Sequence, residues 1–237
     1  MTKDDGAEAR PGGAEALSGD AGFEAVIFDL DGVLVDSEIW WDEVRADLAR
    51  AHGQAWTLEH RRAVMGANSP TWARIIRDEV PIDLPADEIE RLVVAAMVAR
   101  YLTRGTPEIP GAAATVRRVA ARLPVAVASS AHMDVIRAAI SGLGLDGVFG
   151  AVASSDEVPL GKPSPDVYRL AARRLGVDPG RCLVVEDSLN GVRAGKAAGM
   201  AVVLVPNESI PPAEGAAVLA DRVIRALDEL DGLVGRP

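Results

Sequence analysis

Two aspartates at the end of a short apolar run are the residues of this chain with the clearest capacity for chemistry. Asp29 and Asp31 follow residues 25–28, whose β-branched and aromatic side chains are typical of a buried strand. Carboxylates that end a parallel strand lie at the edge of the sheet where open α/β folds bind ligands. Two carboxylates this close repel each other unless a cation lies between them or one keeps its proton, and hard oxygen ligands suit Mg²⁺. Taken alone, the pair is equally consistent with an acidic turn on the surface.

Hydroxyl and ammonium groups follow in two later loops. Ser129 and Ser130 lie between an apolar run and a helical segment, where hydroxyls and backbone N–H groups can bind phosphate, although serine is also a common helix cap. Lys162 is one of only three lysines and lies between a glycine and a proline. Its ammonium could neutralise a phosphoryl oxygen or a carboxylate nucleophile, or could be a surface charge beside a turn.

A second acidic pair repeats the pattern of the first. Glu186 and Asp187 follow the apolar run 182–185. Four carboxylates at one sheet edge would be strongly unfavourable without a cation, and Mg²⁺ is usually held by carboxylates, waters and substrate phosphate. The three histidines are scattered, and Cys182 lies before the end of its strand, so neither a zinc-type spacing nor a Cys-His catalytic pair is present.

The elements that position these residues follow two patterns. Helical periodicity without a strand signal extends over residues 37–107, and from residue 109 onward short apolar runs alternate with helical segments. This alternation predicts an α/β fold with a doubly wound (Rossmann-like) parallel sheet and helices on both faces. We therefore predict a core of residues 23–36 and 108–237, and an inserted all-helical cap domain at 37–107. The later elements include a predicted strand at 147–152 and a last helix at 221–230.

Composition excludes several classes of function. The net charge of −10 disfavours a nucleic-acid partner. The sequence has no run of eighteen apolar residues that could span a membrane, and its single cysteine cannot form an intramolecular disulfide. Residues 1–22 are rich in Gly, Ala and acidic residues without an apolar signal segment, and we predict a disordered N-terminal tail there. These features predict a cytoplasmic protein, which we expect to be a monomer.

The order of these motifs resembles a known family. The chain resembles the haloacid dehalogenase-like hydrolase superfamily in four motifs that occur in the same order: Asp29-Leu-Asp31-Gly32, then Ser129, then Lys162, then Glu186-Asp187. The stretches 29–38, 161–166 and 186–191 resemble its phosphatase and β-phosphoglucomutase-like branch nearly residue for residue, and the likeness covers about residues 23–230.

The resemblance implies a role for each motif residue. Asp29 would be the nucleophile that forms an aspartyl-phosphate, and Asp31 would be the general acid and then the general base. Ser129, Ser130 and Lys162 would bind the transferring phosphoryl group, with Ser129 and Lys162 counted among the catalytic residues. Mg²⁺ would be the cofactor, held by Asp29, the backbone carbonyl of Asp31, Glu186 and Asp187.

Departures from other branches narrow the expected activity. Dehalogenases lack the second aspartate, and phosphonate-cleaving members use a cap lysine, whereas this chain has Asp31 and no lysine in 37–107. Phosphoglucomutases carry a cap histidine and basic residues near a Gly-Val-Ser stretch. Here Trp41 takes the place of the histidine, and the matching stretch 65–69 has no basic residue. We predict a Mg²⁺-dependent phosphatase of a small phosphorylated metabolite, in particular a sugar phosphate; a sugar phosphomutase and a non-catalytic binding protein are the alternatives.

Candidate substrate contacts in the cap come from large side chains and one amide. We predict contacts from Trp41, Met65 and Asn68, with Trp40 and Trp72 as further candidates, although tryptophans in a helical bundle are more often core residues. Several cap arginines are interpreted as solvated charges: Arg61, Arg62, Arg74 and Arg100.

Overall fold

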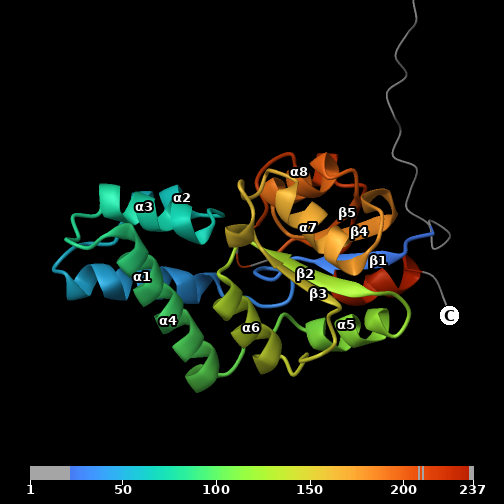
Figure 1. The fold of residues 1–237 in the computed structure, drawn as a ribbon, viewed down its shortest axis with the longest axis horizontal. Helices are drawn as coiled ribbons and strands as arrows, with labels where there is room; N and C mark the ends of the chain where they lie inside the picture. The colour runs from blue at the N-terminus through green and yellow to red at the C-terminus, as the bar shows by residue number, and fades with distance from the viewer. Residues whose placement is uncertain (1–21, 208, 210, 235–237) are drawn as a thin grey trace, which may run out of the picture.

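A six-stranded sheet in which every neighbouring pair is parallel forms the centre of the molecule (Figure 1). The computed structural model describes residues 22–207, 209 and 211–234, so the predicted N-terminal tail lies outside the described residues except for Gly22. The strand order is β3-β2-β1-β4-β5-β6. The strands are β1 (Ala25–Phe28), β2 (Val125–Ser129), β3 (Ala151–Ser154), β4 (Cys182–Glu186), β5 (Ala201–Leu204) and β6 (Arg222–Val223). The α/β fold with a parallel sheet is as predicted.

Helices cover both faces of this sheet because the strand residues that point to each face are apolar. Val26 and Phe28 belong to one hydrophobic core, and Ala25 and Ile27 belong to the other. The first face packs against α5 (Ala112–Ala120), α6 (Met133–Gly142) and the 3₁₀ helix η3 (Leu227–Gly232). The second face packs against α7 (Asp166–Leu175), α8 (Leu189–Ala197) and α9 (Ala216–Leu219). The sheet is therefore doubly wound, with α7 and α8 opposite α5 and α6 in Figure 1.

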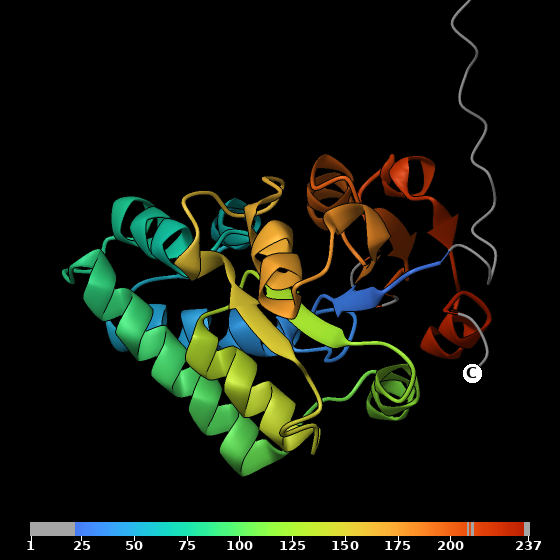
Figure 2. The same ribbon diagram turned by 45° about the vertical axis from the view of Figure 1, so that its right-hand side comes forward.

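Four helices between β1 and α5 form a separate lobe beside the sheet (Figure 1). They are α1 (Glu38–Ala51), α2 (Leu58–Val64), α3 (Ser69–Glu79) and α4 (Ala86–Arg104). Trp72 and Met97 are buried among them, and α4 runs alongside α6 of the core (Figure 2). The chain leaves and re-enters the core at adjacent points, since the Asp36 N–H donates to the Pro107 carbonyl at 2.8 Å. The helices lie within the predicted cap, whose boundaries at 37 and 107 stay a prediction.

Two predicted elements are wrong in detail. The strand expected at 147–152 begins only at Ala151, because Val148 donates to the Leu145 carbonyl in a turn and Gly147 has a φ of +73°. The helix expected at 221–230 is instead β6 followed by η3. Asp221 causes this: its N–H donates to the Val202 carbonyl at 2.9 Å, and its carboxylate accepts from the Val202 N–H at 2.8 Å. The segment is thereby attached to the edge of the sheet. Within the described residues, no helix is both long and apolar enough to cross a bilayer.

Candidate active site

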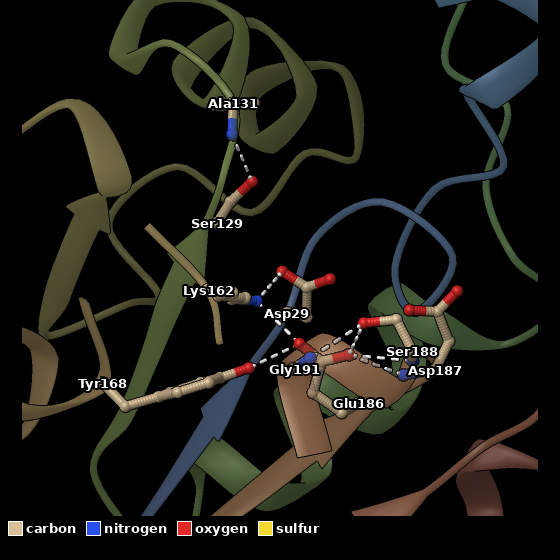
Figure 3. A network of polar contacts seen from close by, with 9 residues as sticks. All are labelled: Asp29, Ser129, Ala131, Lys162, Tyr168, Glu186, Asp187, Ser188 and Gly191. Carbon is tan, nitrogen blue, oxygen red and sulfur yellow. Dashed lines mark hydrogen bonds and ion pairs between the residues drawn. The ribbon is translucent and has the colours of Figure 1, made fainter. Parts of the chain in front are cut away.

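The ends of three adjacent strands bring the predicted motif residues together (Figure 3). β1 lies between β2 and β4, and Phe28 pairs with Val127 on one side and Val185 on the other. The residues that follow in register therefore lie at one edge of the sheet: Asp29 after β1, Ser129 at the end of β2 and Glu186 at the end of β4. Lys162 reaches the same edge from the loop before α7.

Lys162 is the link between these strand ends. Its Nζ donates to Oδ1 of Asp29 and to Oε1 of Glu186, each at 2.7 Å, and its side chain is 4% exposed. The ammonium also lies 4.7 Å from the centre of the Tyr168 ring. Burial disfavours the charged form of a lysine, but the two carboxylates outweigh burial and raise the Lys162 pKa above its ordinary value. The ammonium is therefore a fixed positive charge against Asp29.

Glu186 is fully buried and has donors at both oxygens. Lys162 and the Tyr168 hydroxyl donate to Oε1 at 2.7 Å; the N–H groups of Asp187 and Ser188 and the Ser188 hydroxyl donate to Oε2 at 3.0 Å. Burial alone would raise its pKa, but Lys162 and these hydrogen bonds lower it. A Cβ at Gly191 would lie 1.6 Å from Oε1, so only glycine fits there. Glu186 is thus a permanent anion that holds Lys162.

Asp29 and Asp187 have fewer protein donors than Glu186. Burial raises the pKa of Asp29 to about 7 against the opposing effect of Lys162, and burial together with Glu186 raises the pKa of Asp187 well above its ordinary value. Within the described residues, the Asp187 carboxylate and Oδ2 of Asp29 accept no hydrogen bond. Gly32, at a φ of +87°, makes room for Asp187, because a Cβ there would lie 2.0 Å from Oδ2.

These carboxylates fit a hard divalent cation. One oxygen from each of Asp29, Glu186 and Asp187 lies within 4.8 Å of the other two. Burial raises the pKa of two of these groups, Asp29 and Asp187, so a bound cation would favour their charged forms. A set of oxygen donors without sulfur or nitrogen suits Mg²⁺. For Glu186 to reach a metal it must release one of its donors, whereas Asp187 has none to release.

Asp31 has its own hydrogen-bonding partners from the start of the cap. The Ser37 hydroxyl and the Trp41 indole N–H, the latter at 3.3 Å, both donate to Oδ1 of Asp31. Burial raises the Asp31 pKa, and these two hydrogen bonds oppose the shift. A carboxyl group whose pKa is raised by burial is better suited to act as a general acid than one at its ordinary pKa.

Ser129, the last residue of β2, and Ser130 after it lie at the same edge of the sheet. Ser129 is 1% exposed, and its Oγ accepts from the Ala131 N–H at 3.0 Å. The N-cap of α6 is His132, not a serine, so the capping role considered from the sequence is filled by another residue. Ser129 and Ser130 both line the cavity described next, as phosphate-binding residues must.

A cavity of about 450 Å³ separates this sheet edge from the helical lobe. We call its two sides the core wall (Asp29, Asp31, Ser129, Ser130, Lys162 and Asp187) and the cap wall (Trp41, Arg45, Met65 and Trp72). Trp41 and Met65, which were predicted to be substrate contacts, both line this cavity, and their contact with substrate stays a prediction. Asn68 does not line the cavity and packs against Gly161, and Trp40 packs edge-on against Tyr101 at 5.3 Å.

Four residues of the site were missed by sequence reasoning. Ser37 donates to Asp31, and Tyr168 and Ser188 donate to Glu186; each of the three donors lies within or next to a stretch that resembles the family motifs. The fourth, Arg45, comes one helical turn after Trp41, so the periodicity of α1 places both side chains on one face. Because Trp41 was already a candidate contact, its spacing from Arg45 could have identified Arg45 as a second candidate on the same face of the helix.

Comparisons with known proteins agree with this geometry. The model of the haloacid dehalogenase-like hydrolases matches residues 23–199. The bifunctional riboflavin kinase/FMN phosphatase of Arabidopsis thaliana is 35% identical over 205 residues, which are 85% of this chain but 53% of that protein, so this chain spans about half its length. Hexitol phosphatase B of Escherichia coli (strain K12) is 32% identical over 212 residues, 87% of this chain and 93% of the relative.

A solved structure extends the likeness to the fold. A mutant of CbbY from Rhodobacter sphaeroides, crystallised in complex with xylulose-(1,5)bisphosphate, superposes with a TM-score of 0.77 at 31% identity, covering 90% of this chain and 98% of that one. The chain therefore belongs to the haloacid dehalogenase-like hydrolases. Within that family it is a phosphoric monoester hydrolase of the phosphatase branch.

Proposed function

We propose that this enzyme is a Mg²⁺-dependent phosphatase that hydrolyses a small sugar phosphate through an aspartyl-phosphate on Asp29. The observation that carries the proposal is the buried link from Lys162 to Asp29 and Glu186, with both contacts at 2.7 Å. Relatives support the substrate class, since one is named a hexitol phosphatase and another binds a pentulose bisphosphate.

The arrangement of Asp29 and Asp31 accounts for two successive steps. Lys162 holds Oδ1 of Asp29, which leaves Oδ2 free to attack phosphorus. As the ester bond breaks, Asp31 gives its proton to the leaving alcohol oxygen. In the second step Asp31, now a carboxylate, takes a proton from the water that attacks the aspartyl-phosphate. Inorganic phosphate leaves, Asp29 is regenerated and Asp31 is protonated again.

Charge on the phosphoryl group must be neutralised throughout. Lys162, Ser129 and Ser130 line the cavity and would donate to its oxygens. A loose phosphoryl-transfer transition state depends on such fixed donors. The residues that would hold Mg²⁺ are Asp29, the backbone carbonyl of Asp31, Glu186 and Asp187. A bound Mg²⁺ would supply positive charge to the carboxylates and to the phosphoryl oxygens.

The cap wall is mostly apolar where it faces this chemistry. Trp41 and Trp72 are 5% and 1% exposed, and Met65 extends the same wall. Apolar side chains over the reacting groups exclude bulk water and strengthen the electrostatic interactions of the core wall. We propose that the cap, residues 37–107, sets which phosphate esters fit.

A panel of phosphate esters tests this function. The purified protein is incubated with each ester and MgCl₂, and released phosphate is measured colorimetrically. We expect hydrolysis of at least one hexose or pentose phosphate. Absence of phosphate release across the panel would contradict the proposal. So would accumulation of glucose 6-phosphate without free phosphate from β-glucose 1-phosphate and a bisphosphate primer, which is the behaviour of a mutase.

A further inference from the structure

Arg45 is a buried cation on the cap wall that the catalytic steps do not use. It is 9% exposed and lines the cavity. Its Cζ lies 5.1 Å from the ring centre of Trp41 and 5.2 Å from that of Trp72, so the guanidinium is held against two aromatic rings. Contacts of this kind hold a guanidinium in place, and the faces of the aromatic rings attract its positive charge.

The guanidinium has no anionic partner of its own. Within the described part of the chain it makes no hydrogen bond or ion pair, and its Nε is buried without an acceptor. A charged group with five N–H donors is costly to bury in this way unless something else supplies acceptors. Other buried cations of this protein are paired: Arg100 contacts Glu43 and Asp47, and Lys162 contacts two carboxylates.

Nearby acids do not remove this imbalance. Glu38, Asp42 and Asp31 are close enough to favour the charged form of Arg45, but none of them forms a hydrogen bond with it. Asp42 accepts from Trp56, and Asp31 accepts from Ser37 and Trp41. Burial lowers the pKa of Arg45 to about 10, which still leaves the guanidinium charged at neutral pH. Arg62, exposed on α2, is a second arginine that lines the same cavity.

We propose that Arg45 binds a second anionic group, a carboxylate or a second phosphate, at the end of the substrate opposite the scissile ester. The inference rests on the proposed phosphatase function and narrows its substrate to phosphate esters with an anion at each end. A planar guanidinium matches both carboxylate and phosphate oxygens in a bidentate arrangement. It also changes an expectation from the sequence: residues 65–69 have no basic group for a distant anion, but α1 provides one.

Matched pairs of esters test the proposal and separate the two anions. Fructose 1,6-bisphosphate is compared with fructose 1-phosphate, and 3-phosphoglycerate with glycerol 3-phosphate; kcat/KM is measured with MgCl₂ for each. We expect the doubly anionic member of at least one pair to be preferred. In Arg45→Gln that preference falls on the order of 10- to 100-fold, as for loss of a hydrogen-bonded charge. Arg45→Lys, which keeps the charge without the fork, should give an intermediate ratio.

Arg50→Gln is the matched control, because Arg50 lies on the same helix with its side chain 74% exposed and should leave the preference unchanged. Equal or lower kcat/KM for the doubly anionic members of both pairs, or a preference that survives Arg45→Gln, would overturn the inference. Circular dichroism melting establishes that each variant is folded, and a misfolded Arg45→Gln leaves Arg45→Lys to decide.

Binding measurements keep this test independent of turnover. The thermal midpoint of Asp29→Asn is recorded with each ester, and again in Asp29→Asn combined with Arg45→Gln. We expect a larger shift with the doubly anionic esters, which the second substitution removes. If no ester is hydrolysed but this shift is present, the phosphatase proposal fails and the anion site stands. If esters are hydrolysed without any dependence on Arg45, the phosphatase proposal stands and the anion site fails.

Discussion

In the core wall of the cavity, Lys162 is joined to Asp29 and Glu186 by contacts of 2.7 Å. In the cap wall, Arg45 is buried against two tryptophans and has no hydrogen-bonding or ion-pair partner among the described residues. Both walls contain a buried cation, but only one cation is neutralised by the protein itself. A satisfied network holds reacting atoms in fixed positions before substrate arrives. A buried charged group without protein partners gains hydrogen bonds only from a ligand, so it favours ligands that supply the matching acceptors.

Removal of Asp29, the proposed nucleophile on the core wall, should give the largest effect. We expect Asp29→Asn to lower kcat by at least about 10⁴-fold, because an amide cannot form the aspartyl-phosphate. Single-turnover phosphate release measures the loss. Asp36→Asn is the control, since Asp36 lies in the same motif but accepts from Ser209 outside the cavity wall, and it should retain activity within about threefold. Substantial turnover by Asp29→Asn would mean that another group attacks phosphorus.

Removal of the neutralising cation should give the next largest effect. In Lys162→Met, Asp29 and Glu186 would lose the charge between them and the phosphoryl group would lose a donor, so we expect kcat to fall by about 10² to 10³-fold. The thermal midpoint should also fall, since buried carboxylates are left unpaired. Lys196→Met, which removes a partly exposed ion pair with Asp221, is the comparison. If both variants lost the same stability and activity, the core wall would have no special dependence on Lys162.

Metal binding should be sensitive to pH because it competes with protons on the core wall. The pKa of Asp29 is raised to about 7 by burial, so without metal this carboxyl stabilises the fold at low pH, and the contribution is lost as the pH rises through about 7. Mg²⁺ binds the deprotonated form, so its apparent affinity should be about 30-fold weaker at about pH 5.5 than at about pH 8.

The thermal midpoint with and without MgCl₂ at the two pH values measures this competition. We expect a larger Mg²⁺-dependent increase at the higher pH and restoration of chelator-inhibited activity by Mg²⁺. Asp187→Asn should abolish the increase at both pH values. A shift of equal size at both would show that no carboxyl with a raised pKa takes part in metal binding.

The two walls also differ in how far they could be predicted from the sequence. Parallel strands end at one edge, so Asp29, Ser129 and Glu186 follow from three apolar runs and the polar residues after them. The cap wall depends on how α1 docks against α3. Helical periodicity indicates that Trp41 and Trp72 are buried and that Arg45 shares the face of Trp41, but it does not show that these side chains face a cavity.

Predictions from local sequence patterns were also wrong where contacts between distant segments decide the structure. Residues 221–230 have the apolar spacing of a helix, but hydrogen bonds between Asp221 and Val202 attach this segment to the edge of the sheet. Asn68 was predicted to be a substrate contact of the cap, but its side chain packs against Gly161 and does not line the cavity. In each case a contact between segments distant in sequence decided the outcome, and no local periodicity records such a contact.

The smallest expected effect belongs to Trp41, a cap-wall residue that contacts Asp31 of the core wall. Its indole N–H donates to Asp31 at 3.3 Å, and its ring lies beside the Arg45 guanidinium. Trp41→Phe keeps an aromatic ring and removes the donor, so the pKa of Asp31 should rise further, because a hydrogen bond that favours its charged form is lost. We expect kcat/KM to fall only about 3- to 10-fold, since Ser37 still donates to the same oxygen. The pH dependence of kcat/KM measures the shift. A loss approaching that of Asp29→Asn would place Trp41 with the catalytic core wall, and an unchanged pH profile would assign it to the cap wall alone.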